Sequence, residues 1–361
     1  MSAESRDRLT LSLVAEPLDP RLRECVASHG VSATAAACRG EAGAPQVPAE
    51  WVRRAADLPV EDVVRAGDAA GARWTVPGDD DWPGALDDLD GVAEPGQRPW
   101  GLWVRGCGAL EAGRAVSVVG ARDCTTYGAQ VAGDLGADLA DRGWTVVSGA
   151  AFGIDACAHR GALAVAGRTV AVLACGVDVP YPRAHAALLE RIAEEGGWIL
   201  SEHPPGSTPF RHRFLTRNRI IAALGAGTVV VEAALRSGSL NTLRWSDRLG
   251  RLSMAVPGPV ASAQSGGTHQ AVRSGEAVLV TSAKDVAEEL NGVGWADCDP
   301  SDVLTEAARR AYALLPQSGT GVSAGAMADL LGASQRTARS ALILLERRGR
   351  AGRVGDGWLT R

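Results

Sequence analysis

The sequence predicts an α/β protein built on a doubly wound, mostly parallel β-sheet. Between residues 101 and 290, short runs rich in Val, Ile and Leu alternate with amphipathic segments. Several of the runs are apolar without interruption, which is typical of parallel strands that helices cover on both faces. The alternation of such strands with helices predicts an extended Rossmann-like sheet.

Seven strands and seven helices are predicted in this central region. The strands are Val116–Val119, Trp144–Val147, Thr169–Leu173, Trp198–Leu200, Thr228–Val231, Ser253–Val256 and Ala277–Val280. The helices are Tyr127–Arg142, Asp155–Ala166, His185–Glu195, Arg217–Leu224, Leu240–Leu249, His269–Ser274 and Lys284–Leu290.

A helical domain is predicted before the sheet, at residues 1–75. Arg21–His29 and Ala49–Ala56 each place apolar and charged residues on opposite faces of a helix. Residues 76–100 are rich in Pro, Gly and Asp and are the expected linker to the central domain at 101–290.

A winged helix is predicted after a linker at residues 291–302, in residues 303–361. Gly332–Ser334 is a short connection of the kind that joins the helices of a helix-turn-helix. Arg350–Leu359 predicts a hairpin with an Asp-Gly turn. The three predicted helices are Leu304–Leu315, Ser323–Leu331 and Ser334–Arg347.

Composition excludes several classes of protein. The 361 residues include one lysine, Lys284, which stands in no Gly-Lys-Ser/Thr triplet, so a Walker A loop is excluded. The seven cysteines and six histidines form neither a CxxC nor an HExxH motif, and we expect no metal, no cofactor and no disulfide framework. No segment has the roughly 18–20 apolar residues of a membrane span, and the N-terminus fits no secretory signal, so we expect a cytoplasmic protein.

The net charge of −5 is spread unevenly along the chain. Residues 1–100 carry 10 Arg against 18 Asp and Glu, a net charge of −8. Residues 101–301 carry 18 basic against 19 acidic residues, and residues 302–361 carry 9 Arg against 5 acidic residues, a net charge of +4. Charge balance alone therefore indicates nucleic-acid binding only for the tail.

A ligand site is expected at the strand ends, because open parallel sheets bind ligands beyond the carboxyl ends of their strands. Gly120 and Arg122 follow the first predicted strand, and Ser148, Gly149 and Gly153 follow the second. Such turns let backbone N–H groups approach a phosphate, which a guanidinium can also grip at two points. We predict a phosphate-type ligand; the alternative is that these residues serve only tight turns and helix caps.

Four arginines and two aromatic residues lie together within residues 210–219. Arginines follow a phosphate backbone, and aromatic rings offer faces on which unpaired bases stack. The alternatives are a solvated helix start, or arginines that pair with acids across a dimer. The candidate contacts are Arg211, Arg213, Phe214, Arg217, Asn218 and Arg219.

A third group of candidates follows the fifth predicted strand. Ser237, Gly238 and Ser239 open a helix and form another anion-binding turn. Glu232, at the strand end, can orient a ligand hydroxyl, but we expect it to be the structural partner of an arginine such as Arg219. A buried carboxylate needs a cation.

No catalytic arrangement is predicted. Asp155 and His159 have the i,i+4 spacing that lets side chains meet along a helix, but Cys157 lies on a different face. A helix-capping Asp and a packed His explain these residues, so we expect the protein not to be an enzyme.

Five segments together resemble the DprA/Smf family of DNA-processing proteins. They stand in the family's order over about half of the chain, and the ordered set is specific where each segment alone is weak. The segments are SVVGARDCTTYG (Ser117–Gly128), SGAAFGIDACAHRGAL (Ser148–Leu163), FLTRNRIIAALG (Phe214–Gly225), VVVEAALRSGSLNT (Val229–Thr242), and AVPGP followed by SGGTHQAVRSGEAVLVTSA within Ala255–Ala283.

The resemblance implies an extended Rossmann-like domain between a SAM-like helical domain and a winged helix. It implies a non-enzymatic homodimer that binds and protects incoming single-stranded DNA and promotes loading of the RecA recombinase in natural transformation and recombination. Carried over by motif, the DNA-binding residues would be Gly120, Arg122, Ser148, Gly149, Gly153, Phe214, Arg217, Asn218 and Arg219.

The chain departs from the family pattern in each of the first three segments. Ala121 stands where Ser is usual, and Phe152 stands where Arg is common, so one hydroxyl and one positive charge are missing. Leu215 and Thr216 replace a Pro and a basic residue. In the tail, the resemblance makes four arginines candidate DNA contacts, unless the tail binds protein. They are Arg336, Arg339, Arg347 and Arg348.

Two other functions are open from sequence. A nucleotide or phosphoribosyl hydrolase on a similar sheet would need a PGGxGT loop before its catalytic Glu, whereas Glu232 precedes a Ser-Gly-Ser loop. A winged-helix transcription regulator that senses a nucleotide would need sequence-specific duplex binding by the tail.

Overall fold

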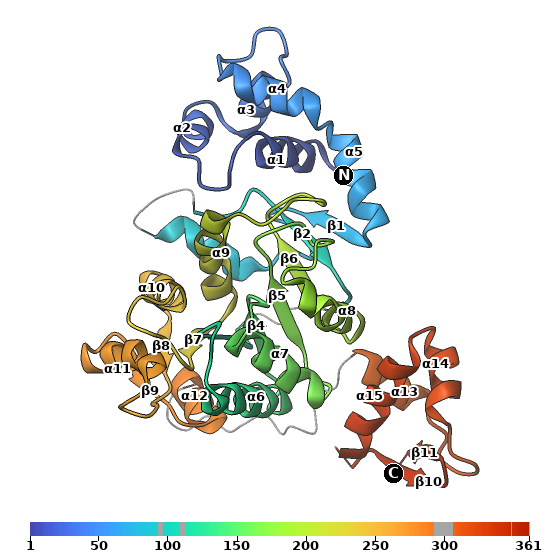
Figure 1. Ribbon diagram of the computed structural model, residues 1–361. Coiled ribbons are helices and arrows are strands. Elements are labelled where there is room, and N and C mark those ends of the chain that lie inside the picture. Colours follow the sequence, from blue (N-terminus) through green and yellow to red (C-terminus); the bar gives the residue numbers. More distant parts are fainter. Residues whose placement is uncertain (93–96, 109–112, 292–305, 348, 361) are drawn as a thin grey trace.

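The structure is a computed structural model that describes residues 1–92, 97–108, 113–291, 306–347 and 349–360. Within these residues, a nine-stranded sheet has the order β1-β2-β6-β5-β4-β3-β7-β8-β9 and forms the centre of the molecule (Figure 1). All neighbours from β6 to β9 are parallel, whereas β2 is antiparallel to both β1 and β6. The predicted α/β class with a large, mostly parallel sheet is confirmed.

The predicted strands are all present in the sheet. They are β3 (Ala115–Val119), β4 (Thr145–Ser148), β5 (Thr169–Val172), β6 (Trp198–Ser201), β7 (Gly227–Val230), β8 (Leu252–Ala255) and β9 (Val278–Leu279). Sequence analysis missed β1 (Ala72–Thr75) and β2 (Leu102–Arg105), and the helical prediction was wrong at β1. The sequence of β1, Ala-Arg-Trp-Thr, is not the apolar run that marked the predicted strands, and its pairing depends on a partner far along the chain.

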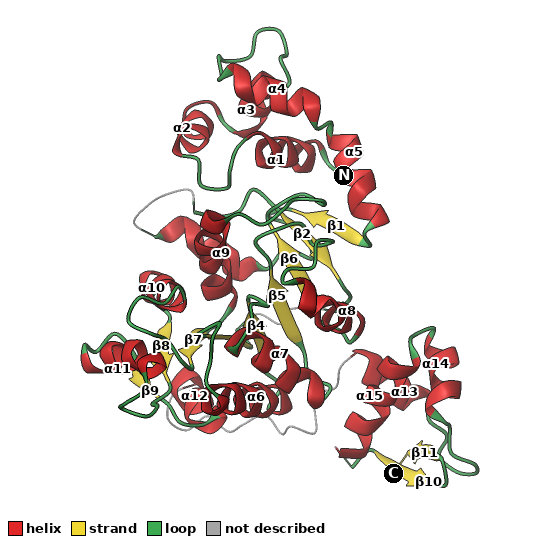
Figure 2. Ribbon diagram, in the orientation of Figure 1, coloured by secondary structure: helices red, strands yellow, loops and turns green. Residues whose placement is uncertain are grey.

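Helices cover both faces of the sheet (Figure 2). Those of the central region are α6 (Thr126–Asp141), α7 (Ile154–Ala164), α8 (Ala186–Glu194), α9 (Arg211–Leu224), α10 (Ser239–Arg248), α11 (Gly266–Arg273) and α12 (Ala283–Asn291). Helix α9 begins at Arg211 rather than at the predicted Arg217. Its first turn is too polar to show an apolar period.

Alternate residues of the strands build two apolar cores. Val116 and Val118 of β3 pack with the buried residues of α6, α7 and α12. Val119, on the opposite face of β3, packs with the buried residues of α9, α10 and the 3-10 helix Gly84–Gly91. Because side chains alternate across a strand, one sequence supplies both layers.

The N-terminal residues form five helices above the edge of the sheet that carries β1 (Figure 1). They are α1 (Ala3–Val14), α2 (Pro20–His29), α3 (Val31–Cys38), α4 (Ala49–Asp57) and α5 (Val60–Ala69). Leu9 and Leu13 of α1 are buried in one core cluster with Trp103 of β2. The N-terminal helices are therefore packed on the sheet through apolar side chains.

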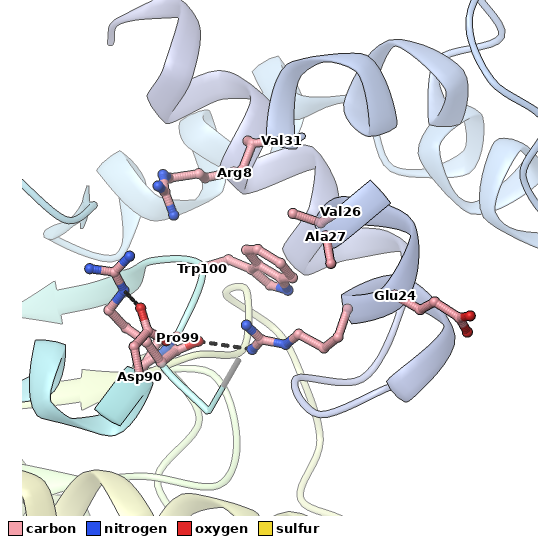
Figure 3. Close-up of a pocket in the computed structure, with 10 residues that line it drawn as sticks. Arg8, Glu24, Val26, Ala27, Val31, Asp90, Pro99 and Trp100 are labelled. Atoms are coloured by element: carbon pink, nitrogen blue, oxygen red, sulfur yellow. Dashed lines mark hydrogen bonds and ion pairs between the residues drawn. The ribbon is translucent and has the colours of Figure 1, made fainter. Parts of the chain in front are cut away.

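Residues 76–100, which the sequence predicted as a loop, are partly built into the core. The 3-10 helix at Gly84–Gly91 buries Leu86 and Leu89 beneath α9. Close by, the Arg23 guanidinium of α2 lies 4.0 Å from the centre of the Trp100 ring and donates to the Arg98 carbonyl at 2.8 Å. A cavity of about 380 Å³ lies at this joint, with Trp100 on its wall (Figure 3).

The C-terminal residues form three helices and a hairpin. The elements are α13 (Glu306–Leu314), α14 (Ala324–Leu331), α15 (Gln335–Arg347), β10 (Ala351–Val354) and β11 (Gly357–Thr360). The hairpin turn is Gly355-Asp356 rather than the predicted Asp356-Gly357, because Val354 pairs with Gly357. Gly355 has a φ of 61°, which suits the first central position of a two-residue hairpin turn. Most of the predicted linker, from residue 292, lies outside the described residues.

None of the helices in the described ranges is long and apolar enough to cross a membrane.

Candidate functional site

The strand order reverses between β3 and β7. Strand β3 pairs with β4 on one side and with β7 on the other, while β5 and β6 continue outward from β4. Parallel strands end at the same edge, so the segments after β3, β4 and β7 meet there. This reversal is where ligands bind in open parallel sheets.

A cavity of about 800 Å³ lies at this edge. The turn after β3, the first half of α9 and the loop after β7 line it. The three predicted groups of site residues, which span residues 120–239 of the chain, are thereby brought together. The predicted residues that line the cavity are Gly120, Arg122, Arg211, Phe214, Arg217, Asn218, Ser237, Gly238 and Ser239.

The turn after β3 has a close backbone approach at Gly120. A Cβ atom on Gly120 would lie 2.6 Å from Cγ1 of Ile154 and 2.8 Å from the Glu232 carbonyl oxygen. The next residue, Ala121, donates its N–H to that carbonyl at 2.7 Å. Glycine is therefore required here, and it lets the turn pack directly on the end of β7.

Arg217 shapes the turn after β4 from inside the protein. It is buried and donates to the Gly149 carbonyl at 2.9 Å and to the Val172 carbonyl. The Asp155 carboxylate accepts the Gly149 N–H at 3.1 Å. Burial lowers the pKa of Arg217 to about 10, so the side chain stays charged at neutral pH.

Ser148 and Gly153 hold the same turn in place and do not line the cavity. The Ser148 hydroxyl is buried and donates to the Val118 carbonyl at 2.6 Å. Gly153 has a φ of 76°, and a Cβ atom on it would collide with the Ala121 carbonyl oxygen. Both residues therefore shape the site through the backbone.

Three arginines of the cavity are exposed and uncommitted. Arg122, Arg211 and Arg236 line it, and within the described part of the chain none of their guanidinium groups makes a hydrogen bond or an ion pair. Arg122 instead lies over the Phe214 ring, with its guanidinium carbon 4.7 Å from the ring centre. Sequence analysis did not select Arg236; its position after a strand and before a Ser-Gly-Ser turn was the available signal.

The loop after β7 is ordered by polar contacts among small residues. Ser237 and Ser239 hydroxyls are 2.7 Å apart, and the Asn218 side-chain amide donates to the Gly238 carbonyl at 3.3 Å. The same amide donates to Asn241 Oδ1 at 3.3 Å. The loop is thus tied to α9 at the entrance of α10.

Two predicted contacts lie away from the cavity. Arg213 donates to the Glu16 carboxylate at 2.6 and 3.0 Å, which links α9 to the loop between α1 and α2. Arg219 is fully buried, and its two terminal nitrogens each lie 2.6 Å from an oxygen of Glu202. The Glu16 carboxylate has a lowered pKa because Arg213 and His212 bond to it, despite partial burial.

The predicted pairing of Glu232 with Arg219 is wrong. Glu232 is fully buried and accepts the backbone N–H of Thr125 at 2.8 Å and its hydroxyl at 2.6 Å. It therefore satisfies the turn that starts α6, and Glu202, the first residue after β6, takes its expected place beside Arg219. Sequence order did not reveal which of two strand-end glutamates faces α9.

The electrostatic character of the cavity favours anions. Four arginines line it, at positions 122, 211, 217 and 236, against Asp123 and Asp155. Helices α7 and α10 also begin at this edge, and their N-termini add partial positive charge. Phe214 and Tyr181 add aromatic surface, with ring centres 5.5 Å apart.

The Asp155, Cys157 and His159 group does not form a reactive centre. Asp155 accepts backbone N–H groups, and His159 Nδ1 lies 2.7 Å from the Thr169 hydroxyl. His159 is fully buried, and burial lowers its pKa to about 3. Among the described residues no group of three His, Cys, Asp or Glu side chains is arranged to hold a metal ion.

In the C-terminal helices, Arg336 and Arg339 are exposed on α15. Neither guanidinium group makes a hydrogen bond or ion pair with another described residue. Arg348 and the side chain of Arg347 lie outside the described residues.

Comparison with known proteins gives consistent matches. The family of DNA recombination-mediator protein A matches residues 73–291. A DNA processing protein DprA of Mycobacterium tuberculosis (strain H37Rv) is 46% identical over 323 residues, which cover 86% of this chain and 82% of that protein. DprA of Bacillus subtilis is 39% identical over 181 residues, which cover 50% of this chain and 60% of that protein.

Two solved structures share the fold. The crystal structure of DprA from Streptococcus pneumoniae covers 80% of this chain and 98% of its own, with a TM-score of 0.63 and 29% identity. The structure of DNA processing protein A from Helicobacter pylori covers 61% of this chain and 97% of its own, with a TM-score of 0.53 and 27% identity. The Helicobacter structure is described as showing a single-stranded DNA binding mode.

Proposed function

This chain belongs to the DprA/Smf family of DNA-processing proteins, and we propose that its cavity at the β3–β7 edge binds single-stranded DNA. The observation that carries the proposal is the set of three exposed arginines, Arg122, Arg211 and Arg236, which line one cavity and whose side chains make no hydrogen bond or ion pair among the described residues. Guanidinium groups left free in an open cavity are available to phosphate oxygens.

The cavity also suits a single strand rather than a free phosphate. Phe214 and Tyr181 lie beside the arginines, and aromatic faces stack unpaired bases of any sequence. Its volume of about 800 Å³ lies within the roughly 300–1,000 Å³ of ordinary ligand sites. The Helicobacter relative, whose structure is described by its single-stranded DNA binding, supports the same ligand.

The predicted site residues divide into two roles under this proposal. Some contact DNA directly: these are Gly120, Arg122, Arg211, Phe214, Asn218, Ser237, Gly238 and Ser239. Others hold the turns and α9 in shape: these are Ser148, Gly149, Gly153, Arg213, Arg217, Arg219 and Glu232. Arg236 joins the first group.

The wider role that we infer is non-enzymatic: a homodimer that protects incoming single-stranded DNA and promotes RecA loading in transformation and recombination. Support for a dimer comes from β9, an edge strand whose Val278 and Leu279 are 38% and 49% exposed. An unpaired edge with exposed apolar side chains is a template for another chain. Glu232, the residue a hydrolase would need, is committed to Thr125.

The domain division follows the same proposal. The proposed winged helix at 303–361 follows a linker at 291–302, and the proposed helical domain at 1–75 ends before β1, which belongs to the sheet. The predicted linker at 76–100 contributes its 3-10 helix, Gly84–Gly91, to the central core. The short turn between α14 and α15 and the hairpin after α15 support the winged helix. Exposed Arg336 and Arg339 on α15 support DNA phosphates as its partner.

Fluorescence anisotropy with a labelled oligonucleotide and its duplex tests the proposal. We expect sequence-tolerant, salt-sensitive binding that favours the single strand. Equal binding of both forms, or preference for one duplex sequence, would overturn it.

A further inference from the structure

Phe152 is an exposed aromatic residue that belongs neither to the proposed DNA contacts nor to the residues that shape the turns. It stands in the turn after β4, and 49% of its surface is exposed. The chain has only three phenylalanines, and the other two, Phe210 and Phe214, stand at the start of α9 on the same edge of the sheet. An apolar ring exposed beside a cationic cavity is available to a planar partner.

Contacts within the protein hold the Phe152 ring in one orientation. The ring packs edge-on against His185, with centres 4.9 Å apart and planes at 66°. His185 is buried and donates from Nδ1 to the Ala150 carbonyl at 3.0 Å, in the same turn. A ring fixed before a ligand arrives loses little conformational entropy on binding.

The turn of Phe152 packs against the turn of Arg122. Ile154 donates its N–H to the Ala121 carbonyl at 3.2 Å. A Cβ atom on Gly153 would lie 2.6 Å from the Arg122 carbonyl oxygen. Ala151, the residue before Phe152, lines the cavity. The backbone of Phe152 therefore lies beside the cavity, between Ala151, which lines it, and Gly153, which packs on the backbone of Arg122.

We propose that Phe152 is a base-stacking residue, which binds one unpaired nucleobase of the strand whose phosphate lies at Arg122. This inference rests on the proposed function and adds a subsite to it. A base in a duplex is already stacked and paired, so a stacking contact selects for a single strand. The contact is uncharged, and its share of the affinity does not depend on salt.

The test compares Phe152→Ala, Phe152→Leu and Phe152→Trp with the parent by anisotropy across a salt series. Phe152→Ala and Phe152→Leu should bind a single-stranded oligonucleotide about 5- to 150-fold more weakly, the range for loss of one stacked base. Their salt slope should equal that of the parent, and Phe152→Trp should bind like the parent. Leu58→Ala, at a site that is 46% exposed and lies between α4 and α5, is the matched control and should leave single-strand binding unchanged.

A second probe isolates the base from the backbone. An oligomer of the same length with abasic deoxyribose at every position retains the phosphates and removes every base. Phe152→Ala and the parent should bind it equally. Equal binding of ordinary DNA by parent and Phe152→Ala would overturn the inference, as would equal weakening on both oligomers, or a change only in the oligomeric state. Failure of the parent to favour single strands would instead overturn the proposed function.

Discussion

The guanidinium carbon of Arg122 lies 4.7 Å from the centre of the Phe214 ring. Arg122 follows β3, and Phe214 stands in the first half of α9, so the contact joins two parts of the chain that are far apart in sequence. It places a cation and an aromatic face at one wall of an open cavity. This pairing is what a strand with charged phosphates and flat bases requires.

Replacing Arg122 should weaken single-strand binding in a salt-dependent way. Each phosphate contact contributes about 0.7 to the slope of log K against log salt for a single strand. Arg122→Gln should therefore lower the affinity at low salt and reduce the slope by about 0.7. Anisotropy at several salt concentrations measures both quantities.

Arg213→Gln is the matched comparison, at an arginine of α9 that lies away from the cavity. Arg213 is already bonded to Glu16, so its loss removes no free cation from the cavity. The salt slope should equal that of the parent, and the free energy of unfolding should fall by about 0.2–1 kcal/mol, as for a partly exposed ion pair. A slope reduced as much as in Arg122→Gln would show that Arg213 leaves Glu16 to bind DNA.

Arg219→Met should destabilise the fold strongly. Glu202 is buried and accepts two hydrogen bonds from Arg219, so the substitution leaves a buried carboxylate without its cation. The expected loss is about 3–5 kcal/mol in the free energy of unfolding, measured by denaturant titration. Adding Glu202→Leu should recover most of that loss; no recovery would show that the pair is not the cause.

Acid should destabilise the protein through two buried histidines. Burial lowers the pKa of His159 to about 3 and that of His203 to about 4, from an ordinary value of 6.5. A lowered histidine pKa means that the unfolded chain binds more protons, so this stabilisation is complete above about pH 6.5 and declines as the pH falls toward 3–4. The free energy of unfolding, followed between pH 7.5 and 4, should fall less steeply in His159→Gln than in the parent.

Gly153→Ala should damage the site although Gly153 does not line the cavity. Its φ of 76° is unfavourable for alanine, and the added methyl group would collide with the Ala121 carbonyl. Gly250→Ala is the control, because Gly250 has a φ of 65° and open space around it. Gly153→Ala should lose more stability and more single-strand affinity than Gly250→Ala; equal losses would mean that only backbone strain matters.

The sequence was sufficient for the parts of the fold that depend on local pattern. The strands from β3 to β9 are apolar runs, and each was found within a few residues of its bounds. Strands β1 and β2 were missed because they lie outside the alternation of parallel strands and helices and depend on antiparallel pairing across an intervening segment. The burial of Leu86 and Leu89 also came from tertiary contact, in a segment whose composition is that of a loop.

The site was predictable to the level of which segments meet. The strand-end rule brought the turns after β3, β4 and β7 together, with α9 across them. Partner choice within the site was not predictable: Glu202 rather than Glu232 binds Arg219, and Glu16 binds Arg213. Which arginines stay free depends on which acidic residues of other elements lie near them, and sequence order does not reveal the distances between those side chains.

The central claim is that the free arginines of the cavity bind DNA phosphates. The most direct measurement is the salt dependence of single-strand affinity for the parent and for the combined variant Arg122→Gln, Arg211→Gln, Arg236→Gln. Three lost phosphate contacts should reduce the slope by about 2 and weaken binding at low salt. The melting temperature should change little, because none of the three side chains makes a hydrogen bond or ion pair in the described structure and the contact of Arg122 with Phe214 is exposed. A combined variant that binds single strands with the parent's affinity and slope would contradict the account.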